Sequence, residues 1–179
     1  EGQRVSALQL LEARAASAEN DERWEEALAA WREAAGLEPV LASAREGIER
    51  STARAELQQR MDALMQHQER LWEPAGRGEA HAVLALAAEA GNPRQHLAAT
   101  ARDLEQLAAA AEKPVRLRLE SDGLTSIAIY RIGQYGTFSQ RDVELLPGRY
   151  TVVGTRTGFR DVRREVVLMP GAVPPAVVV

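Results

Sequence analysis

Through residues 1–113, apolar residues recur at steps of three and four, which is the period of an amphipathic helix. Asn20 and Asp21 are expected to cap one such helix. Its apolar positions are Trp24, Ala27, Leu28, Trp31, Ala34 and Ala35. Gly36 is expected to adopt the left-handed conformation that ends this helix, and Pro39 prevents its continuation.

Three more helices are predicted after Pro39. One covers 41–72, and the residues expected to end it are Pro74, Gly76 and Gly78. The next covers 79–90 and closes at Gly91, after which Asn92 and Pro93 start the last. The packing seam of this last helix consists of Leu97, Ala101, Leu104, Ala108 and Ala111.

From residue 114 onward the pattern changes to strict alternation of apolar and polar residues, which is typical of strands with one solvated face. The predicted strands are 115–120, 127–132, 138–145, 150–155 and 162–168. The predicted turns are Asp122-Gly123, Gly133–Gly136, Pro147-Gly148 in a type II turn, and Gly158. Residues 176–179 are a candidate edge strand. This order predicts a small antiparallel β-sandwich or open barrel.

Composition supports a division into two domains within an α+β fold. Residues 1–113 carry 13 basic and 20 acidic side chains, a balance of −7, and are rich in helix formers. Residues 114–179 carry 9 basic and 6 acidic side chains, a balance of +3, and are rich in strand formers. We therefore expect an antiparallel helical domain over 1–113 and a β-sandwich over 114–179.

The 179 residues include no cysteine, which excludes disulfides, thiolate nucleophiles and cysteine-ligated metal clusters. No apolar run reaches the roughly 18 to 20 residues of a membrane-spanning helix. Because the chain opens with Glu1 and not with Met, we expect a removed N-terminal segment that carried a signal or membrane anchor.

The stretch from Leu8 to Pro39 resembles a single tetratricopeptide-like helical hairpin. The small and aromatic positions of that pattern are occupied by Ala15, Ala27, Trp31 and Ala34. Alanine at these positions allows helices to approach closely around an aromatic wedge. The usual aromatic near the start of the first helix is Leu11 here, and no second clean copy follows.

The β part resembles a PEGA-type domain, a small bacterial sandwich common in envelope and surface proteins. The motif is Leu145-Leu146-Pro147-Gly148-Arg149-Tyr150-Thr151-Val152, followed by Gly158-Phe159. The family's Pro-x-Gly-Ala segment is replaced by Ser121-Asp122-Gly123-Leu124. The resemblance implies a binding or spacing module without catalytic residues, located in the periplasm and tethered through the missing N-terminal segment.

The densest basic group of the chain surrounds one aromatic residue, Phe159. It comprises Arg156, Arg160, Arg163 and Arg164. Guanidinium groups can bind phosphate or carboxylate in a bidentate manner, and Phe159 can stack on a ligand. The alternative is a solvated face neutralised by Asp161 and Glu165.

Two other aromatic residues are candidate contact points. Tyr135 lies beside a glycine turn with Phe138, and the alternative is that Phe138 belongs to the core while Tyr135 shields the end of the sheet. Trp72 lies at a predicted helix end and either packs the turn or marks a partner surface. Trp24 and Trp31 face the alanines and are expected in the hairpin core.

No motif for catalysis, a metal or a cofactor is found in the sequence, so none is predicted. The three histidines, His67, His81 and His96, lack the spacing of metal ligands. Glu25 and Glu26 are adjacent on a predicted helix and point apart, and Asp142 and Glu144 lie on the solvent-facing side of a predicted strand. Neither pair is expected to act as a glycosidase pair.

These observations predict a non-catalytic interaction or scaffolding protein of the bacterial cell envelope that binds a partner protein or a cell-wall glycan. Self-association is left open. The alternative is a cytoplasmic nucleic-acid or phospholigand binder that uses the Arg156–Arg164 region, for which binding would depend steeply on salt.

The hairpin assignment predicts the effect of one substitution. Trp31→Ala should lower the free energy of unfolding by about 3 to 5 kcal/mol, because it removes a large buried side chain and leaves a cavity. Chemical denaturation of the full chain measures this difference. A change below about 0.5 kcal/mol would mean that Trp31 is exposed and that the hairpin interpretation is wrong.

Overall fold

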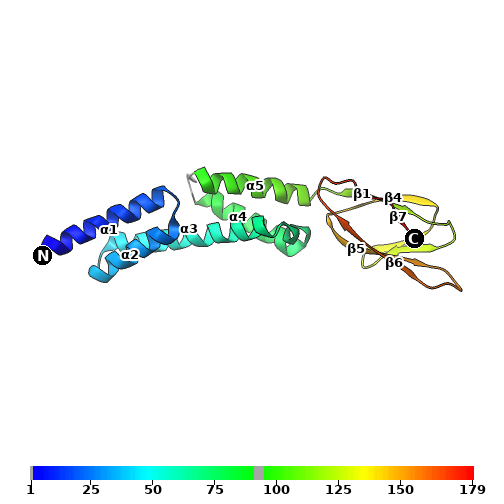
Figure 1. Cartoon of the computed structure of the whole chain (residues 1–179), viewed down its shortest axis with the longest axis horizontal. Coiled ribbons are helices and arrows are strands. Elements are labelled where there is room, and N and C mark those ends of the chain that lie inside the picture. Colours follow the sequence, from blue (N-terminus) through cyan, green and yellow to red (C-terminus); the bar gives the residue numbers. More distant parts are fainter. Residues whose placement is uncertain (1, 91–94) are drawn as a thin grey trace. The chain divides into compact units, whose positions relative to one another are not determined.

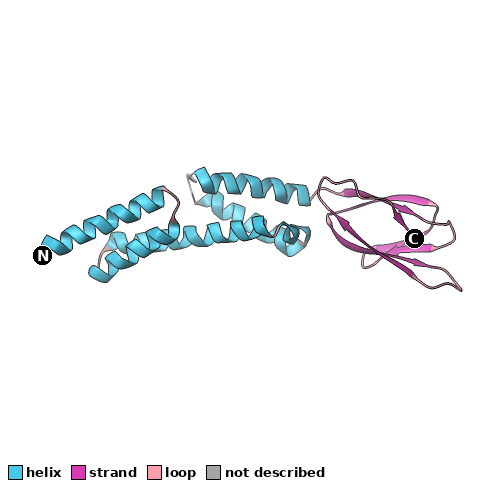
Figure 2. Cartoon of the chain, viewed as in Figure 1, coloured by secondary structure: helices cyan, strands magenta, loops and turns pink. Residues whose placement is uncertain are grey.

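The computed structural model of this chain describes residues 2–90 and 95–179. Helices occupy the first part and strands the second, so the predicted α+β class is confirmed (Figures 1 and 2). The helices are α1 (Gly2–Asn20), α2 (Trp24–Leu37), α3 (Ala42–Gln66), the short 3₁₀ helix η1 (Gln68–Trp72), α4 (Pro74–Glu89) and α5 (Gln95–Ala111).

The chain forms two compact units. The helical unit comprises the residues up to His67 together with Glu79–Glu105, and the β unit comprises Gln68–Gly78 together with Gln106–Val179. The change from helix to strand lies between Ala111 and Val115.

Small buried residues hold α1, α2 and the start of α3 together. The core cluster consists of Ala15, Ala18, Ala27, Ala30, Trp31, Ala34 and Ala44. Trp24 is buried as well. The ring of Trp31 lies so close to Gly47 of α3 that a Cβ there would be 2.4 Å from two ring carbons. Close helix approach at alanines around an aromatic wedge is therefore present in this hairpin.

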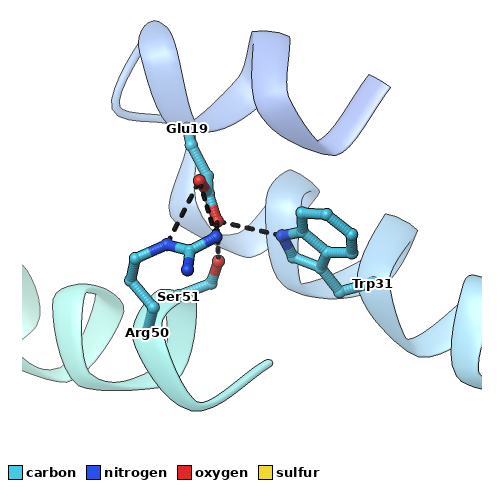
Figure 3. A network of polar contacts seen from close by, with 4 residues as sticks. All are labelled: Glu19, Trp31, Arg50 and Ser51. Atoms are coloured by element: carbon cyan, nitrogen blue, oxygen red, sulfur yellow. Dashed lines mark hydrogen bonds and ion pairs between the residues drawn. The ribbon is translucent and has the colours of Figure 1, made fainter. Parts of the chain in front are cut away.

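Glu19 of α1 joins the first three helices through one carboxylate (Figure 3). Trp31 Nε1 of α2 donates to Glu19 Oε1 at 2.9 Å. Two neighbours on α3 donate to the same oxygen, Arg50 Nη2 at 2.9 Å and the buried Ser51 Oγ at 3.0 Å. The Glu19 side chain is only 15% exposed.

The charge of Glu19 is retained despite this burial. Burial alone would raise its pKa, but the hydrogen bonds from Trp31, Arg50 and Ser51 outweigh that effect and lower the pKa below its ordinary value. The ionised carboxylate therefore stabilises the three-helix arrangement.

The first helix junction differs from the prediction. Asn20 ends α1, and α2 begins at Trp24 with Arg23 at its N-cap and no side-chain cap. Glu22 takes a positive φ of 57°, and its carboxylate accepts the backbone N–H groups of His96 and Leu97 at 2.7 and 3.0 Å. Local backbone bonds close the junction, among them Arg23 N–H to the Ala18 carbonyl oxygen at 2.8 Å, and the Glu22 carboxylate joins it to the start of α5.

The C-terminal end of α2 also differs from the prediction. Gly36 lies within α2 without a positive φ, and the helix continues to Leu37. The predicted helix over 41–72 ends earlier, at Gln66, and η1 follows. The predicted start at Asn92 and Pro93, with Gly91 before it, lies outside the described residues.

Pro74 begins α4 instead of ending a helix, and Gly76 and Gly78 lie inside it. Proline is compatible with the first turn of a helix, where its missing N–H has no intrahelical partner. Gly76 is required by space, since a Cβ there would lie 1.9 Å from the carbonyl oxygen of Arg70.

The β unit contains two sheets that share one core. The strands are β1 (Val115–Glu120), β2 (Ser126–Ile129), β3 (Gly133–Thr137), β4 (Gln140–Leu145), β5 (Gly148–Thr155), β6 (Val162–Leu168) and β7 (Val177–Val178). Their orders are β4-β1-β7 and β3-β2-β5-β6. Alternate side chains of both sheets are buried against one another, among them Leu117, Leu119, Ile127, Val152 and Leu168. The arrangement is a β-sandwich.

All strand pairs are antiparallel except that of β1 with β7, which is parallel. The predicted edge strand at 176–179 is thus confirmed in part, as β7. The predicted turn at Gly133–Gly136 is wrong, because these residues form most of β3 and pair with β2 across an irregularity in register.

The Pro147-Gly148 corner is not a type II turn, because Gly148 has no positive φ and already begins β5. The corner is closed instead by a side chain, since Tyr150 Oη donates to the carbonyl oxygen of Leu146 at 2.8 Å. Burial raises the pKa of Tyr150, with a smaller opposing effect of Arg77.

Because the pKa of Glu19 is lowered in the folded state, its contribution to stability should be present above the pKa of an unfolded glutamate and lost as pH falls through the folded value. Glu19→Gln should therefore lower the free energy of unfolding by about 1 to 3 kcal/mol at pH 7. The difference from the parent chain should shrink below about pH 4. Denaturation series from pH 3 to pH 7 measure it.

Glu33→Gln is the matched control, since Glu33 is exposed and lies 3.9 Å from Arg14. It should change stability by less than about 0.5 kcal/mol. An equal effect of the two substitutions, or a Glu19→Gln effect that does not depend on pH, would contradict this role of Glu19.

Candidate functional site

Two loops meet at one end of the sandwich, where β1 leads into β2 and β5 leads into β6. We call this region, residues 121–125 and 156–161, the loop end. The loops are adjacent because Ser126 of β2 pairs with Thr155 of β5. Gly123 and Gly158 both adopt a positive φ, of 77° and 87°, which allows each loop to turn tightly.

The Asp122 carboxylate fixes both loops. Its Oδ1 accepts the backbone N–H groups of Leu124 and Thr125, each at 2.8 Å. Its Oδ2 accepts Arg156 Nη1 of the other loop, also at 2.8 Å. The two backbone bonds, the Thr125 side chain and the charge of Arg156 lower the pKa of Asp122 to about 2. Asp122 is therefore ionised at physiological pH. We call its contacts with Leu124, Thr125 and Arg156 the clasp.

The clasp positions an aromatic residue at the surface. Arg156 lies over the ring of Phe159, with Cζ 4.6 Å from the ring centroid. Phe159 N–H donates to the carbonyl oxygen of Arg156 at 3.0 Å, which holds the ring beside the guanidinium. Phe159 is nevertheless 67% exposed, and Leu124 of the neighbouring loop is 63% exposed. The loop end thus displays two large apolar side chains on a fixed backbone.

The structure does not direct all the predicted arginines to one place. Arg156 is engaged by Asp122, whereas Arg160, Arg163 and Arg164 are exposed. Arg163 and Arg164 are adjacent on β6, so their side chains point to opposite faces of the strand. One phosphate group therefore does not meet all four guanidinium groups in this arrangement.

Tyr135 lies on β3, half-buried, and packs against the sandwich core together with Phe138. Arg141 lies over its ring at 5.3 Å from the centroid and donates to the Tyr135 carbonyl oxygen at 3.0 Å. This places Tyr135 as a side chain at the rim of the core.

Trp72 lies in the β unit at the end of η1 and is partly exposed. Arg77 Nη1 donates to its carbonyl oxygen at 2.8 Å and to that of Leu71 at 3.2 Å. Arg77 also affects the titration of Tyr150, at the corner where β4 leads into β5. Trp72 therefore belongs to a turn at the opposite end of β1 from the clasp.

In residues 2–90 and 95–179, no group of three or more His, Asp or Glu side chains lies close enough together to hold a metal ion. Asp142 is bound by Arg118 at 3.1 Å, which lowers its pKa. Over the same part of the chain, no helix is both long and apolar enough to cross a membrane.

Sequence reasoning identified Arg156 and Phe159 but not Asp122 and Leu124. The signal that was available is Asp122-Gly123 in a short loop, since aspartate commonly accepts backbone N–H groups two residues further on. What local sequence does not contain is the pairing of Asp122 with Arg156, which lies 34 residues away.

The chain matches no protein-family model, no curated protein and no solved structure.

The clasp predicts a measurable protection of two amides. Asp122→Ala removes the acceptor for Leu124 and Thr125 N–H, so hydrogen exchange of these amides should accelerate by about tenfold or more. Asp122→Asn keeps an acceptor oxygen and should preserve most of the protection while losing the ion pair with Arg156. Exchange measured by NMR at pH 5 to 7 distinguishes the three chains.

Asp161→Ala is the control, because it removes an exposed carboxylate from the same loop end without touching the clasp. Unchanged exchange at Leu124 and Thr125 in Asp122→Ala would show that the loops are held by other contacts.

Proposed function

We propose that this chain is a non-catalytic interaction module of the bacterial cell envelope, which binds a partner protein or a cell-wall component through the loop end of its sandwich. The observation that carries the proposal is the clasp itself. It presents Phe159 and Leu124, both about two-thirds exposed, on loops that are already ordered.

The energetics of such a surface favour binding. Burying a Phe or Leu side chain stabilises a complex by roughly 1.5 to 3 kcal/mol each. Loops that are fixed before binding lose little conformational entropy when they dock. Arg156, which covers one side of the Phe159 ring, supplies a polar boundary beside the apolar contact.

The envelope location is part of this proposal and is supported by the resemblance of residues 145–159 to the PEGA motif. A periplasmic position follows from the same resemblance. The tetratricopeptide-like hairpin of α1 and α2, with its buried alanines and Trp31, supports a second interaction module within the chain. The chain would act by holding partners, and no bond would be made or broken.

The test uses the full chain and two classes of partner. Co-sedimentation with purified peptidoglycan sacculi measures wall binding. A photo-crosslinking amino acid at position 159, in cells that export the chain to the periplasm, measures protein binding as discrete adducts. The double variant Leu124→Ser with Phe159→Ser should weaken whichever binding is found by about tenfold or more, since each lost apolar contact is worth at least 1 kcal/mol.

Tyr130→Ser is the matched control, because Tyr130 is an equally exposed aromatic residue at the other end of β2. It should leave binding unchanged. The proposal is overturned if neither arm gives saturable binding, or if the double variant binds as well as the parent chain.

A further inference from the structure

The two edges of β1 are used very differently. Along one edge all six residues, Val115–Glu120, pair with β4. Along the other edge only Leu119 and Glu120 pair, with β7. In an antiparallel pair, every second residue of a strand directs its N–H and C=O away from the neighbouring strand. Within residues 115–118 of β1, such backbone groups point to the edge opposite β4, where no described strand pairs with them.

The sequence before β7 explains why the ladder stops. Continuing the parallel register of Leu119 with Val177 would bring Pro175 opposite Leu117 and Pro174 opposite Arg116. Proline has no N–H to donate and is excluded from interior ladder positions. Residues 172–176 therefore run past β1 without forming a strand.

A cleft of about 800 Å³ lies between these two segments. Its one wall is formed by Ala172, Val173, Pro174 and Ala176, and its other wall by the outward side chains of β1 and by Asp142 of β4. Lys113 and Pro114 line it where β1 begins. The apolar wall faces a charged one, and three of the β1 residues that line the cleft, Val115, Arg116 and Arg118, belong to the stretch without a partner in β7.

The cleft is lined by three cations, Lys113, Arg116 and Arg118, and by two carboxylates, Glu120 and Asp142, which lie toward the end of β1 away from Lys113. Arg118 is matched by Asp142 at 3.1 Å. Arg116 lies 3.9 Å from Glu144, with both side chains about two-thirds exposed, and Lys113 is exposed as well. The end near Lys113 and Arg116 therefore presents two cations that can accept further negative charge.

We propose that this cleft binds an extended acidic peptide segment of a partner protein, which adds as a strand to the open edge of β1. The peptide backbone would complete the ladder at residues 115–118, and its carboxylates would meet Lys113 and Arg116. This surface runs along β1 and includes no residue of the loop end, and the inference does not rest on binding there.

The test measures fluorescence anisotropy of a labelled, end-blocked peptide of alternating Val and Glu with the full chain. Saturable binding is expected. The double charge reversal Lys113→Glu with Arg116→Glu should weaken it by about tenfold or more. The matched control is Arg163→Glu with Arg164→Glu, which makes the same change in net charge on β6 and should leave affinity within about twofold. Circular dichroism verifies that each variant is folded.

Backbone pairing is tested separately from charge. Two further peptides carry N-methyl groups, one at the odd-numbered amides and the other at the even-numbered amides. Only the peptide whose methylated amides would face β1 should lose binding, because the methyl group removes the hydrogen-bond donor of the ladder. The proposal is overturned if the Val/Glu peptide does not bind saturably. It is also overturned if both N-methylated peptides bind as well as the unmodified Val/Glu peptide. Equal binding of a Val/Lys peptide or of oligothymidylate would overturn it too. The Leu124→Ser, Phe159→Ser variant should bind the peptide as the parent chain does. A failure of the loop-end proposal can therefore be distinguished from a failure of this one.

Discussion

The Asp122 carboxylate is the interaction on which the surface of the β unit depends most directly. One oxygen closes its own loop and the other holds the next loop through Arg156, so a single side chain sets the geometry of both connections. The same bond decides the chemical character of the loop end. It engages Arg156, which sequence alone leaves open between a ligand-binding group and a solvated face, and it leaves Phe159 and Leu124 exposed.

The two proposed binding surfaces use different physical chemistry. One consists of the loops after β1 and β5, and the other runs along β1 itself. At the loop end, affinity would come from burial of apolar side chains on ordered loops, which is largely indifferent to the direction of a partner's backbone. At the cleft, it would come from backbone hydrogen bonds whose direction and spacing are fixed by β1, with charge adding selectivity. A partner that uses both surfaces would be held in a defined orientation. Asp122 and the prolines at 174 and 175 are the residues that create these two surfaces.

Much of the architecture follows from periodicity, for a physical reason. The alternation in β1, β5 and β6 is visible because each strand buries every second residue in a shared core. In the helical unit, the expected core positions Ala15, Ala27, Trp31 and Ala34 are buried because the helical period places them on one face.

The errors lie where long-range contacts override local preference. Pro74 and Gly76 suggest a break in isolation, but proline also starts helices, and Gly76 serves a close approach to the backbone of Arg70. The glycines of 133–136 suggest a turn, but pairing with β2 makes them a strand. Glu19 was assigned no role, because its partners on α3 lie 31 and 32 residues away. The clasp was missed for the same reason.

Gly47 carries a consequence for how this sequence can change. The ring of Trp31 occupies the space that any side chain at position 47 would need, while its indole N–H is bound to Glu19. A side chain at position 47 would force the Trp31 ring to move, and a smaller residue at 31 would leave both a void above the glycine and a carboxylate with one donor fewer. Positions 19, 31 and 47 should therefore evolve as one unit, and relatives that differ at one of them should differ at the others.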